Sequence, residues 1–313
     1  MRRISIFFLG FLLIITQAKS QVNWTDVSSD FGELPDGMRI FKTEDSLNGK
    51  PFRAFYASIP LSSKQVEFTT EVGEGKRFTP TQYYTKSGKP YLVVNGTFFS
   101  FSTNQNLNLV MKDGKMVAYN VQAVKRKDSD TFYYPTRAAI GIKGKKADVA
   151  WTFTDTADRY PYAFTDAPLI AKGLDPDPSF KDLATRQRNK KWKMNTAIGG
   201  GPVLIHNELI RITSREEQRF AGGEDDLHPR TAMGYTSDGN LIVLAVEGRN
   251  PGTAAGVSLT DMAVILKNIG CYEALNLDGG GSSCMLINGI ETIKPSDQGG
   301  QRPVPAVFMV TPK

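Results

Sequence analysis

The sequence contains few of the residues that bind zinc or form disulfide scaffolds. Its 313 residues include only two cysteines, Cys271 and Cys284, and two histidines, His206 and His228. A structural zinc site takes four such ligands at characteristic spacings, so this composition argues against one. The cysteines form either one disulfide or two buried thiols. We expect thiols, because Cys271 follows a predicted helix and Cys284 begins a predicted strand.

Several well-known catalytic and binding motifs are also missing. The chain has no nucleophile elbow, P-loop, HExxH or EF-hand pattern. We therefore expect no metal and no cofactor. We found no internal repeat, which argues against solenoids and propellers.

Long hydrophobic runs are absent except near the N-terminus. An apolar run from Ile4 to Ile15 follows Arg2 and Arg3 and precedes Ala18-Lys19-Ser20. The run is short for a membrane span, and the small residues after it match a cleavage site. Residues 1–20 are thus predicted to be a signal peptide, with an uncleaved anchor as the alternative. We expect a secreted or periplasmic protein with no stable membrane insertion after cleavage.

The mature chain carries no strong charge of either sign. Loss of Arg2, Arg3 and Lys19 with the signal peptide lowers the formal net charge from +6 to +3. Nucleic-acid binding normally needs a concentrated positive surface. We therefore expect no nucleic-acid partner.

Strand patterns dominate the rest of the chain. Short β-branched and aromatic runs such as "FRAFYASIP", "YLVVNGTFF" and "LIVLAVEG" recur, and three turn dipeptides lie between apolar runs: Asp113-Gly114, Asp238-Gly239 and Asn288-Gly289. We predict an α+β fold with a mixed, mostly antiparallel sheet and a few helices on its faces, in a single domain. Residues 21–78 are expected to be a β-rich extension packed on a domain of residues 79–313.

Two predicted helices lead into strands that end near polar residues. "SLTDMAVILKNIG" has Ser258 and Asp261 as a capping box, an apolar stripe and Gly270 as the stop. A weaker helix within 79–88 precedes a strand that ends at Asn95, and the first helix precedes one that ends at Asp278. Polar residues followed by glycine at strand ends are typical of ligand-binding loops.

The stretch "LDGGGSS", residues 277–283, is the most unusual part of the chain. Three consecutive glycines lose more conformational entropy on folding than one tight turn requires. Bare backbone instead indicates close approach of a ligand to amide N–H groups beside Asp278. A long hairpin loop is the alternative.

Three further polar clusters fall at predicted strand ends: "NGTFF" at 95–99, "HPRTAMG" at 228–234 and "VEGRN" at 246–250. With the glycine loop they supply two carboxylates, arginines and amide groups. An enzyme that acts on an anionic sugar derivative needs this combination, with arginine forks for phosphate oxygens and carboxylates for chemistry at the anomeric carbon.

The order of these motifs resembles the phosphodiester glycosidase family over residues 79–313. The motifs that carry the resemblance are "NGTFF", "GGGPVLIHNELI", "RTAMGYTSDGNLIVLAVEGR", "LNLDGGGSSCMLING" and "RPVPAVFMV". The resemblance implies hydrolysis of a sugar-1-phosphodiester, such as an N-acetylglucosamine-1-phosphate diester, or binding of a phosphorylated glycan. It implies Asp278 and Glu247 as catalytic residues. The expected substrate-binding residues are Asn95, His228, Arg230, Arg249, Gly279, Gly280, Gly281, Ser282 and Arg302.

Two other functions fit the same clusters. A glycan-binding protein without catalysis would not need two convergent carboxylates. A phosphodiesterase that cleaves on the phosphorus side would need metal ligands or an activated nucleophile, and the sequence offers neither clearly.

Overall fold

The computed structural model describes residues 22–313 except residues 122, 126–131, 134 and 168–189. The predicted signal peptide at residues 1–20 lies outside the described residues. No helix within the described ranges is long and apolar enough to cross a membrane. Both cysteines are buried and unpaired, which confirms the expectation of two thiols.

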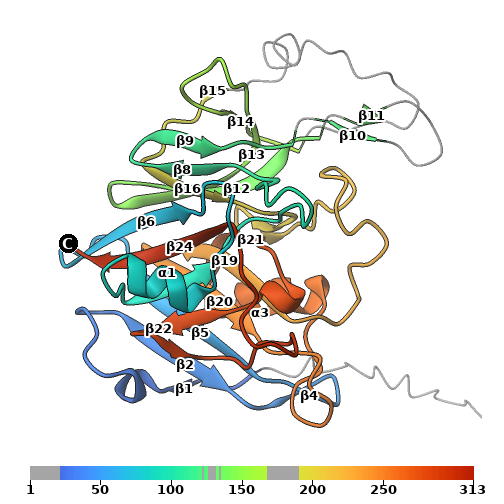
Figure 1. The fold of residues 1–313 in the computed structure, drawn as a ribbon. Coiled ribbons are helices and arrows are strands. Elements are labelled where there is room, and N and C mark those ends of the chain that lie inside the picture. The colour runs from blue at the N-terminus through green and yellow to red at the C-terminus, as the bar shows by residue number, and fades with distance from the viewer. Residues whose placement is uncertain (1–21, 122, 126–131, 134, 168–189) are drawn as a thin grey trace, which may run out of the picture.

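Three sheets make up most of the fold (Figure 1). The eight-stranded sheet has, in spatial order, β1 (Thr25–Asp26), β2 (Arg39–Thr43), β5 (Ala54–Pro60), β20 (Asn240–Val246), β19 (Arg230–Thr236), β21 (Cys271–Asn276), β17 (Val203–His206) and β18 (Leu209–Ile210). The seven-stranded sheet has β15 (Lys190–Lys191), β14 (Tyr162–Phe164), β13 (Lys146–Phe153), β12 (Arg137–Lys143), β16 (Thr196–Gly199), β8 (Val110–Lys112) and β9 (Lys115–Ala118). The five-stranded sheet has β23 (Ile290–Glu291), β22 (Met285–Ile287), β7 (Leu92–Asn95), β24 (Ala306–Pro312) and β6 (Val66–Val72).

The remaining elements are short. Two further strand pairs are β3 (Ser46–Leu47) with β4 (Lys50–Pro51), and β10 (Val124–Lys125) with β11 (Phe132–Tyr133). The helical elements are α1 (Pro80–Lys86), α3 (Leu259–Ile269) and the 3₁₀ turns η1 (Ser28–Phe31) and η2 (Gly280–Ser282). The sheets therefore carry most of the structure, so the α+β description holds only loosely.

One hydrophobic core joins the three sheets. It includes Ile40 and Val243 of the eight-stranded sheet, Val94 of the five-stranded sheet, and Ile140 and Trp151 of the seven-stranded sheet. Side chains alternate along β20, so its odd-numbered apolar residues enter this core and its even-numbered ones pack beneath α3. A strand buried on both faces reads as a continuous apolar run, which is what "LIVLAV" is.

The local predictions for helices and turns are confirmed. The side chain of Ser258 accepts a hydrogen bond from the Asp261 N–H at the start of α3, and Gly270 ends the helix with a φ of 101°. The carboxylate of Asp261 accepts the Ser258 hydroxyl rather than closing a full capping box. In α1, Thr79 and Gln82 do form one. All three predicted dipeptides turn antiparallel hairpins: β8–β9, β19–β20 and β22–β23.

The expected mixture of parallel and antiparallel strands is not found, because every strand pairing in the described parts of the chain is antiparallel. The two helix-to-strand units are present. In each unit, however, the two strands joined by the helix are not paired with each other, because a third strand lies between them. In the path through α1, β24 lies between β6 and β7, and in the path through α3, β19 lies between β20 and β21. Strands from before residue 79 share these sheets, since β5 pairs with β20 and β6 with β24.

Candidate active site

The loop 277–283 is held where strands of two sheets end. The Leu277 N–H donates to Thr231 O over 2.8 Å, and the Asp278 N–H donates to Gly96 O over 3.1 Å. On its other side, Asn95 Nδ2 donates to Asp278 O over 2.6 Å. The backbone of Leu277 is thus bound by β19 and that of Asp278 by the end of β7, which fixes the position of the loop.

Asn95 connects these elements from a fully buried position. Its Oδ1 atom accepts hydrogen bonds from Thr231 Oγ1 over 2.8 Å and from the Cys284 N–H over 3.1 Å. Together with the bond from Nδ2 to Asp278, these contacts engage both polar atoms of the Asn95 side chain in hydrogen bonds to other groups of the protein. In this geometry Asn95 positions the loop 277–283.

The three glycines are required because the loop has almost no free space around it. A Cβ atom on Gly279 would lie 2.9 Å from Pro229 O, and one on Gly280 would lie 3.2 Å from Arg249 Nη1. Gly280 also has a φ of +61°, and a Cβ atom on Gly281 would overlap Asp297 Oδ1 and Arg302 Nη2. Backbone carbonyls and arginine side chains therefore approach the loop more closely than any side chain there would allow.

Arg230 is buried against the loop, with an exposed fraction of 2%. Its Nε donates to Val257 O over 3.3 Å and its Nη2 donates to Asp226 O over 3.1 Å. Burial lowers the pKa of Arg230 to about 10. Arg230 forms no ion pair with a carboxylate among the described residues. Asp226 stabilises the charge of Arg230 from a distance, without a direct ion pair.

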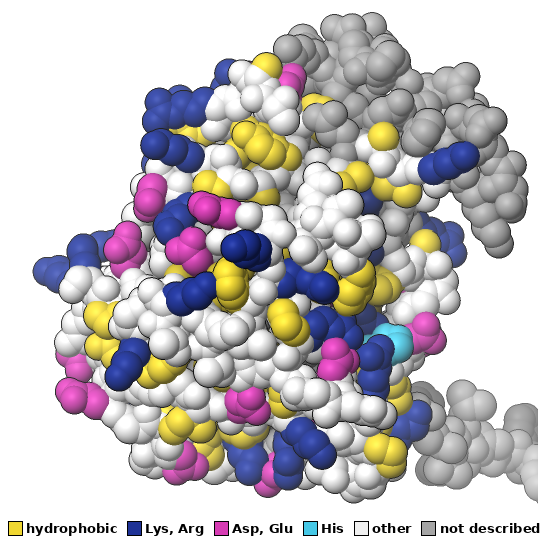
Figure 2. Space-filling view, viewed as in Figure 1, with side chains coloured by type: hydrophobic (Ala, Val, Ile, Leu, Met, Phe, Trp, Pro, Cys, Tyr) yellow, Lys and Arg dark blue, Asp and Glu magenta, His cyan; other side chains and the backbone are white. Residues whose placement is uncertain are grey.

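Arg249 and His228 lie together beside Gly280. The Nη2 atom of Arg249 is 3.2 Å from His228 Nδ1. Partial burial, followed by the charges of Arg230 and Arg249, lowers the pKa of His228. The imidazole is therefore neutral at pH 7 and can accept a hydrogen bond from the arginine. Figure 2 shows Lys and Arg side chains gathered around a histidine on the face drawn in Figure 1.

Arg302 joins the far end of the loop to Asp297. It donates from Nε to Asp297 Oδ2 over 2.7 Å and from Nη2 to Oδ1 over 2.9 Å, and from Nη1 to Ser282 Oγ over 3.3 Å. This bidentate geometry holds Arg302 firmly. Ser282 also makes a side-chain hydrogen bond to Asp278, so Asp278, Ser282, Arg302 and Asp297 form one chain of contacts.

The carboxyl group of Asp278 is the most perturbed acid of the loop. Burial raises its pKa from 3.8 to about 6, against the opposing effects of hydrogen bonds from Ser282 and the Gly279 N–H and of the charges of Arg302 and Arg219. The Gly279 N–H donates to Oδ1 over 2.9 Å. A carboxyl group that titrates near pH 6 is ionised at pH 7 and basic enough to accept a proton.

Glu247 has a different environment. Its exposed fraction is 1%. Oε1 accepts from Asn250 Nδ2 over 2.9 Å, Oε2 accepts from the Lys294 N–H over 3.0 Å, and Arg53 Nη1 lies 3.8 Å from Oε2. Glu247 is not among the groups that shift the pKa of Asp278. The structure thus gathers the other predicted residues around the loop, while the carboxylate of Glu247 is bound by Arg53, Asn250 and Lys294.

Four residues around the loop were not singled out for the site from the sequence: Phe98, Arg219, Phe220 and Asp297. Arg219 Cζ lies 3.9 Å from the centroid of the Phe98 ring, and Arg230 Cζ lies 5.1 Å from that of Phe220. The ring of Phe98 is only partly buried, whereas Phe99 belongs to the core. No local motif marks Arg219 or Asp297, because both reach the loop only through folding.

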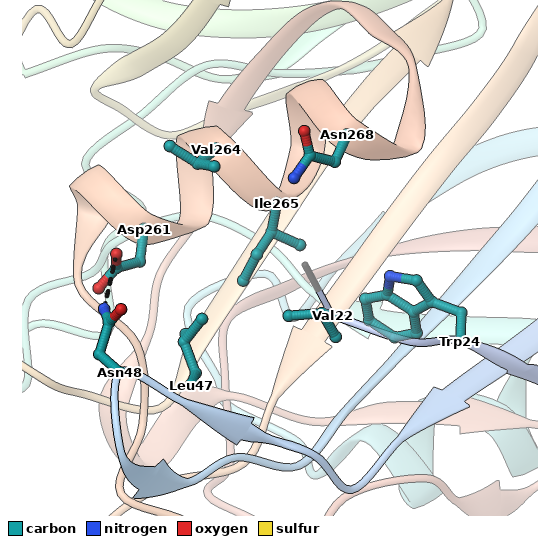
Figure 3. A pocket seen from close by; sticks show the side chains of 8 residues that line it. All are labelled: Val22, Trp24, Leu47, Asn48, Asp261, Val264, Ile265 and Asn268. Carbon is teal, nitrogen blue, oxygen red and sulfur yellow. Dashed lines mark hydrogen bonds between the residues drawn. The ribbon is translucent and has the colours of Figure 1, made fainter. Parts of the chain in front are cut away.

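Four hollows among the described residues lie away from this loop. A cavity of about 20 Å³ between α3 and the N-terminal segment is lined mainly by apolar side chains, and Asn48 binds Asp261 at its edge (Figure 3). It has room for about one water molecule. Three open hollows of about 310, 480 and 530 Å³ are lined by none of the predicted site residues. Within the described ranges, no group of His, Cys, Asp and Glu side chains is arranged to hold a metal ion.

Comparison with known proteins links this loop to a family. Mouse N-acetylglucosamine-1-phosphodiester alpha-N-acetylglucosaminidase is 33% identical over 206 residues, which cover 65% of this chain and 33% of the mouse protein. A SPbeta prophage-derived uncharacterized protein, YomE, of Bacillus subtilis is 42% identical over 62 residues, 20% of this chain and 10% of that protein. These matches span a third or less of the relatives' own length.

Solved structures share the fold. The catalytic domain of zebrafish N-acetylglucosamine-1-phosphodiester alpha-N-acetylglucosaminidase, auto-inhibited by its pro-peptide, superimposes with a TM-score of 0.61 at 20% identity, covering 94% of this chain and 89% of that chain. A hypothetical protein from Synechocystis gives 0.59 at 17% identity, covering 89% and 62%. The family model for phosphodiester glycosidases matches residues 88–311. The chain therefore belongs to the phosphodiester glycosidase family, as its motifs predicted.

Proposed function

We propose that this protein hydrolyses a sugar-1-phosphodiester between the anomeric carbon and the phosphate oxygen, releasing a free sugar and a phosphomonoester. The observation that carries the proposal is the environment of the Asp278 carboxyl group. Its carboxyl group has a pKa of about 6 and lies on a loop without side chains at the next three positions. The guanidinium groups of Arg230, Arg249 and Arg302 surround that loop. Family membership supports a glycosidase reaction.

The reaction needs a base or nucleophile and a site for developing negative charge. Asp278 either takes a proton from the attacking water or attacks the anomeric carbon itself. As the bond from that carbon to the phosphate oxygen breaks, its electron pair remains on the oxygen, and the phosphate changes from a monoanion to a dianion. Arginine side chains stabilise this added charge. The leaving group needs little protonation for this reason.

We assign Glu247 a positioning role in place of the catalytic role expected from the sequence. Its carboxylate accepts bonds from Asn250 and Lys294 and has an exposed fraction of 1%. A base that is already bound and excluded from solvent cannot easily receive a substrate proton. By holding Asn250, Glu247 keeps the neighbouring Arg249 beside Gly280.

The sugar and the location are finer proposals. The names of the relatives support N-acetylglucosamine or a similar sugar on a phosphodiester or a phosphorylated glycan. The N-terminal pattern of residues 1–20 supports export, so that the enzyme would act outside the cytoplasm.

Hydrolysis in ¹⁸O-labelled water tests the position of cleavage. A panel of sugar-1-phosphodiesters is incubated with the protein, and the products are analysed by NMR and mass spectrometry. The proposal expects the label on the sugar C1 hydroxyl and none in the phosphomonoester. Label in the phosphate would identify a phosphodiesterase that cleaves on the phosphorus side. Binding of the panel without turnover would identify a non-catalytic glycan-binding protein.

A further inference from the structure

Arg219 is a charged residue next to the proposed active site to which the proposed mechanism gives no role. It lies on the segment between β18 and β19. Glu217, two residues earlier, is fully buried and anchors that segment. Its carboxylate accepts hydrogen bonds from the Val203 N–H over 2.8 Å, the Thr213 hydroxyl over 2.6 Å and the Ala138 N–H over 3.0 Å. The Arg219 N–H in turn donates to Ser214 O over 2.8 Å. The backbone at Arg219 is therefore firmly placed.

The guanidinium group of Arg219 is close enough to Glu217 and Asp278 to feel their charges, but it makes no direct ion pair with either. It forms no ion pair with a carboxylate in the described parts of the chain, and its buried Nε atom has no hydrogen-bond partner. Burial, and then the nearby charge of Arg137, lower the pKa of Arg219 to about 9, against the opposing charges of Glu217 and Asp278. An unpartnered buried donor of this kind is costly unless a ligand satisfies it.

The surroundings of Arg219 connect it with Arg230. The guanidinium of Arg219 stacks on Phe98, that of Arg230 lies over Phe220, and the centroids of the two rings are 5.8 Å apart. Arg230 itself lies against Gly279, and the charge of Asp278 acts on Arg219. Two buried arginines that make no direct ion pair among the described residues are thus linked by a pair of aromatic rings.

We propose that Arg219 binds the phosphate group of the substrate together with Arg230, an inference that rests on the proposed function. A phosphodiester carries one negative charge, and its phosphomonoester product carries up to two. The two arginines match that product, so they hold the phosphate more tightly as the glycosidic bond breaks. Arg219 then contributes to kcat as well as to KM.

Binding of inorganic phosphate and steady-state kinetics test this role. Arg219→Gln is compared with Arg215→Gln, which removes an exposed arginine four residues earlier on the same segment. We expect Arg219→Gln to weaken phosphate binding and lower kcat/KM by about 10- to 100-fold, the effect of one charge-assisted hydrogen bond. Arg215→Gln should behave as the unmodified protein does.

A second variant covers the case in which Arg219→Gln does not fold. Arg219→Lys keeps the charge but lacks the planar fork of the guanidinium group. It should lower the phosphate affinity and kcat/KM as Arg219→Gln does, but by a smaller factor. Unchanged phosphate binding and unchanged kcat/KM in a folded Arg219 variant would overturn the inference.

The two measurements also separate this inference from the proposed function. If the unmodified protein cleaves no sugar-1-phosphodiester but binds phosphate in a way that depends on Arg219, the anion site stands and the proposed reaction falls. If the protein is active and the Arg219 variants are equally active, the reaction stands and the role of Arg219 falls.

Discussion

The two predicted catalytic carboxylates follow two strands of one sheet that are separated only by β19, and each precedes a glycine. Asp278 follows β21 in "LDGG", and Glu247 follows β20 in "VEGR". The structure gives them opposite environments. Glu247 is bound by Asn250, Lys294 and Arg53, whereas Asp278 accepts from its own loop and has a pKa of about 6. Similar sequence contexts thus produce one carboxylate bound by donors from other parts of the chain and one bound within its own loop.

The environments of the two carboxylates differ because different hydrogen-bond donors and cations reach each of them. Arg53 and Lys294 come from distant parts of the chain to meet Glu247, and two hydrogen bonds satisfy its oxygens. Around Asp278 the nearby cations are Arg302, which is already bound to Asp297, and Arg219. Burial therefore outweighs attraction at Asp278, and its ionised form is disfavoured.

The largest expected effect comes from Asp278→Asn. Turnover of a sugar-1-phosphodiester should fall by about 100-fold or more, the scale of a lost general base. The Tm at pH 7 should stay equal or rise. The native state binds more protons than the unfolded chain between pH 4 and pH 6, so the ionised carboxylate lowers stability as the pH rises through that range.

Asp36→Asn is the control, because Asp36 is exposed and binds only Gln65 within the described residues. An Asp278→Asn protein that melts normally and turns over at the unmodified rate would show that the loop is scaffolding and would remove the distinction between the two carboxylates.

Gly281→Ala should have the next largest effect. The added Cβ overlaps Asp297 and Arg302, so the loop must shift, and misplacement of reacting groups costs activity steeply. We expect kcat/KM to fall by about 10- to 100-fold, with a smaller change in Tm than in activity. Gly299→Ala is the matched control, since a Cβ there meets nothing within 4 Å. Equal kinetics in the two variants would contradict the close packing of the loop.

The pH dependence of kcat/KM tests whether Asp278 is the carboxyl group that titrates during the reaction. The kcat/KM of the unmodified protein should fall as the pH drops below about 6, because the ionised form of Asp278 is the active one. The charge of Arg302 lowers the pKa of Asp278, so Arg302→Gln should move the midpoint of the profile to higher pH. Arg39→Gln removes a surface ion pair with Asp26 and should leave the midpoint in place. A midpoint that does not move in Arg302→Gln would mean that another group controls the profile.

Glu247→Gln should have the smallest effect on turnover. Its side-chain amide can keep only one of the two bonds from Asn250 and Lys294, and we expect the free energy of unfolding to fall by about 1–3 kcal/mol, measured by urea denaturation. We expect kcat to change by less than about threefold. Glu44→Gln is the control, because Glu44 binds the same Arg53 over 2.6 Å from an exposed position. A loss of kcat comparable with that of Asp278→Asn would restore Glu247 as a catalytic residue.

The sequence by itself determined the local features of this protein and its family. Asp113-Gly114, Asp238-Gly239 and Asn288-Gly289 turn hairpins because their backbones adopt the required conformations, and Ser258 and Gly270 begin and end α3 through contacts within a few residues. The "LDGGGSS" loop was also marked out by its consecutive glycines, although the sequence assigned the bare backbone to a ligand and the structure shows that groups of the protein itself pack against it.

Only the tertiary structure decided how these pieces meet. The insertion of β24 between β6 and β7, and of β19 between β20 and β21, removed the parallel pairings expected from the two helix-to-strand units, which no local pattern indicates. Folding also bound Glu247 to Arg53 and Lys294, buried Asn95 beneath the loop, and brought Arg219 next to Asp278. Each of these outcomes depends on distances between residues that are far apart in the chain, and hydrophobic periodicity and turn chemistry act only over a few neighbours. Desolvation and charge pairing, which set the protonation of Asp278, arise from those distances alone.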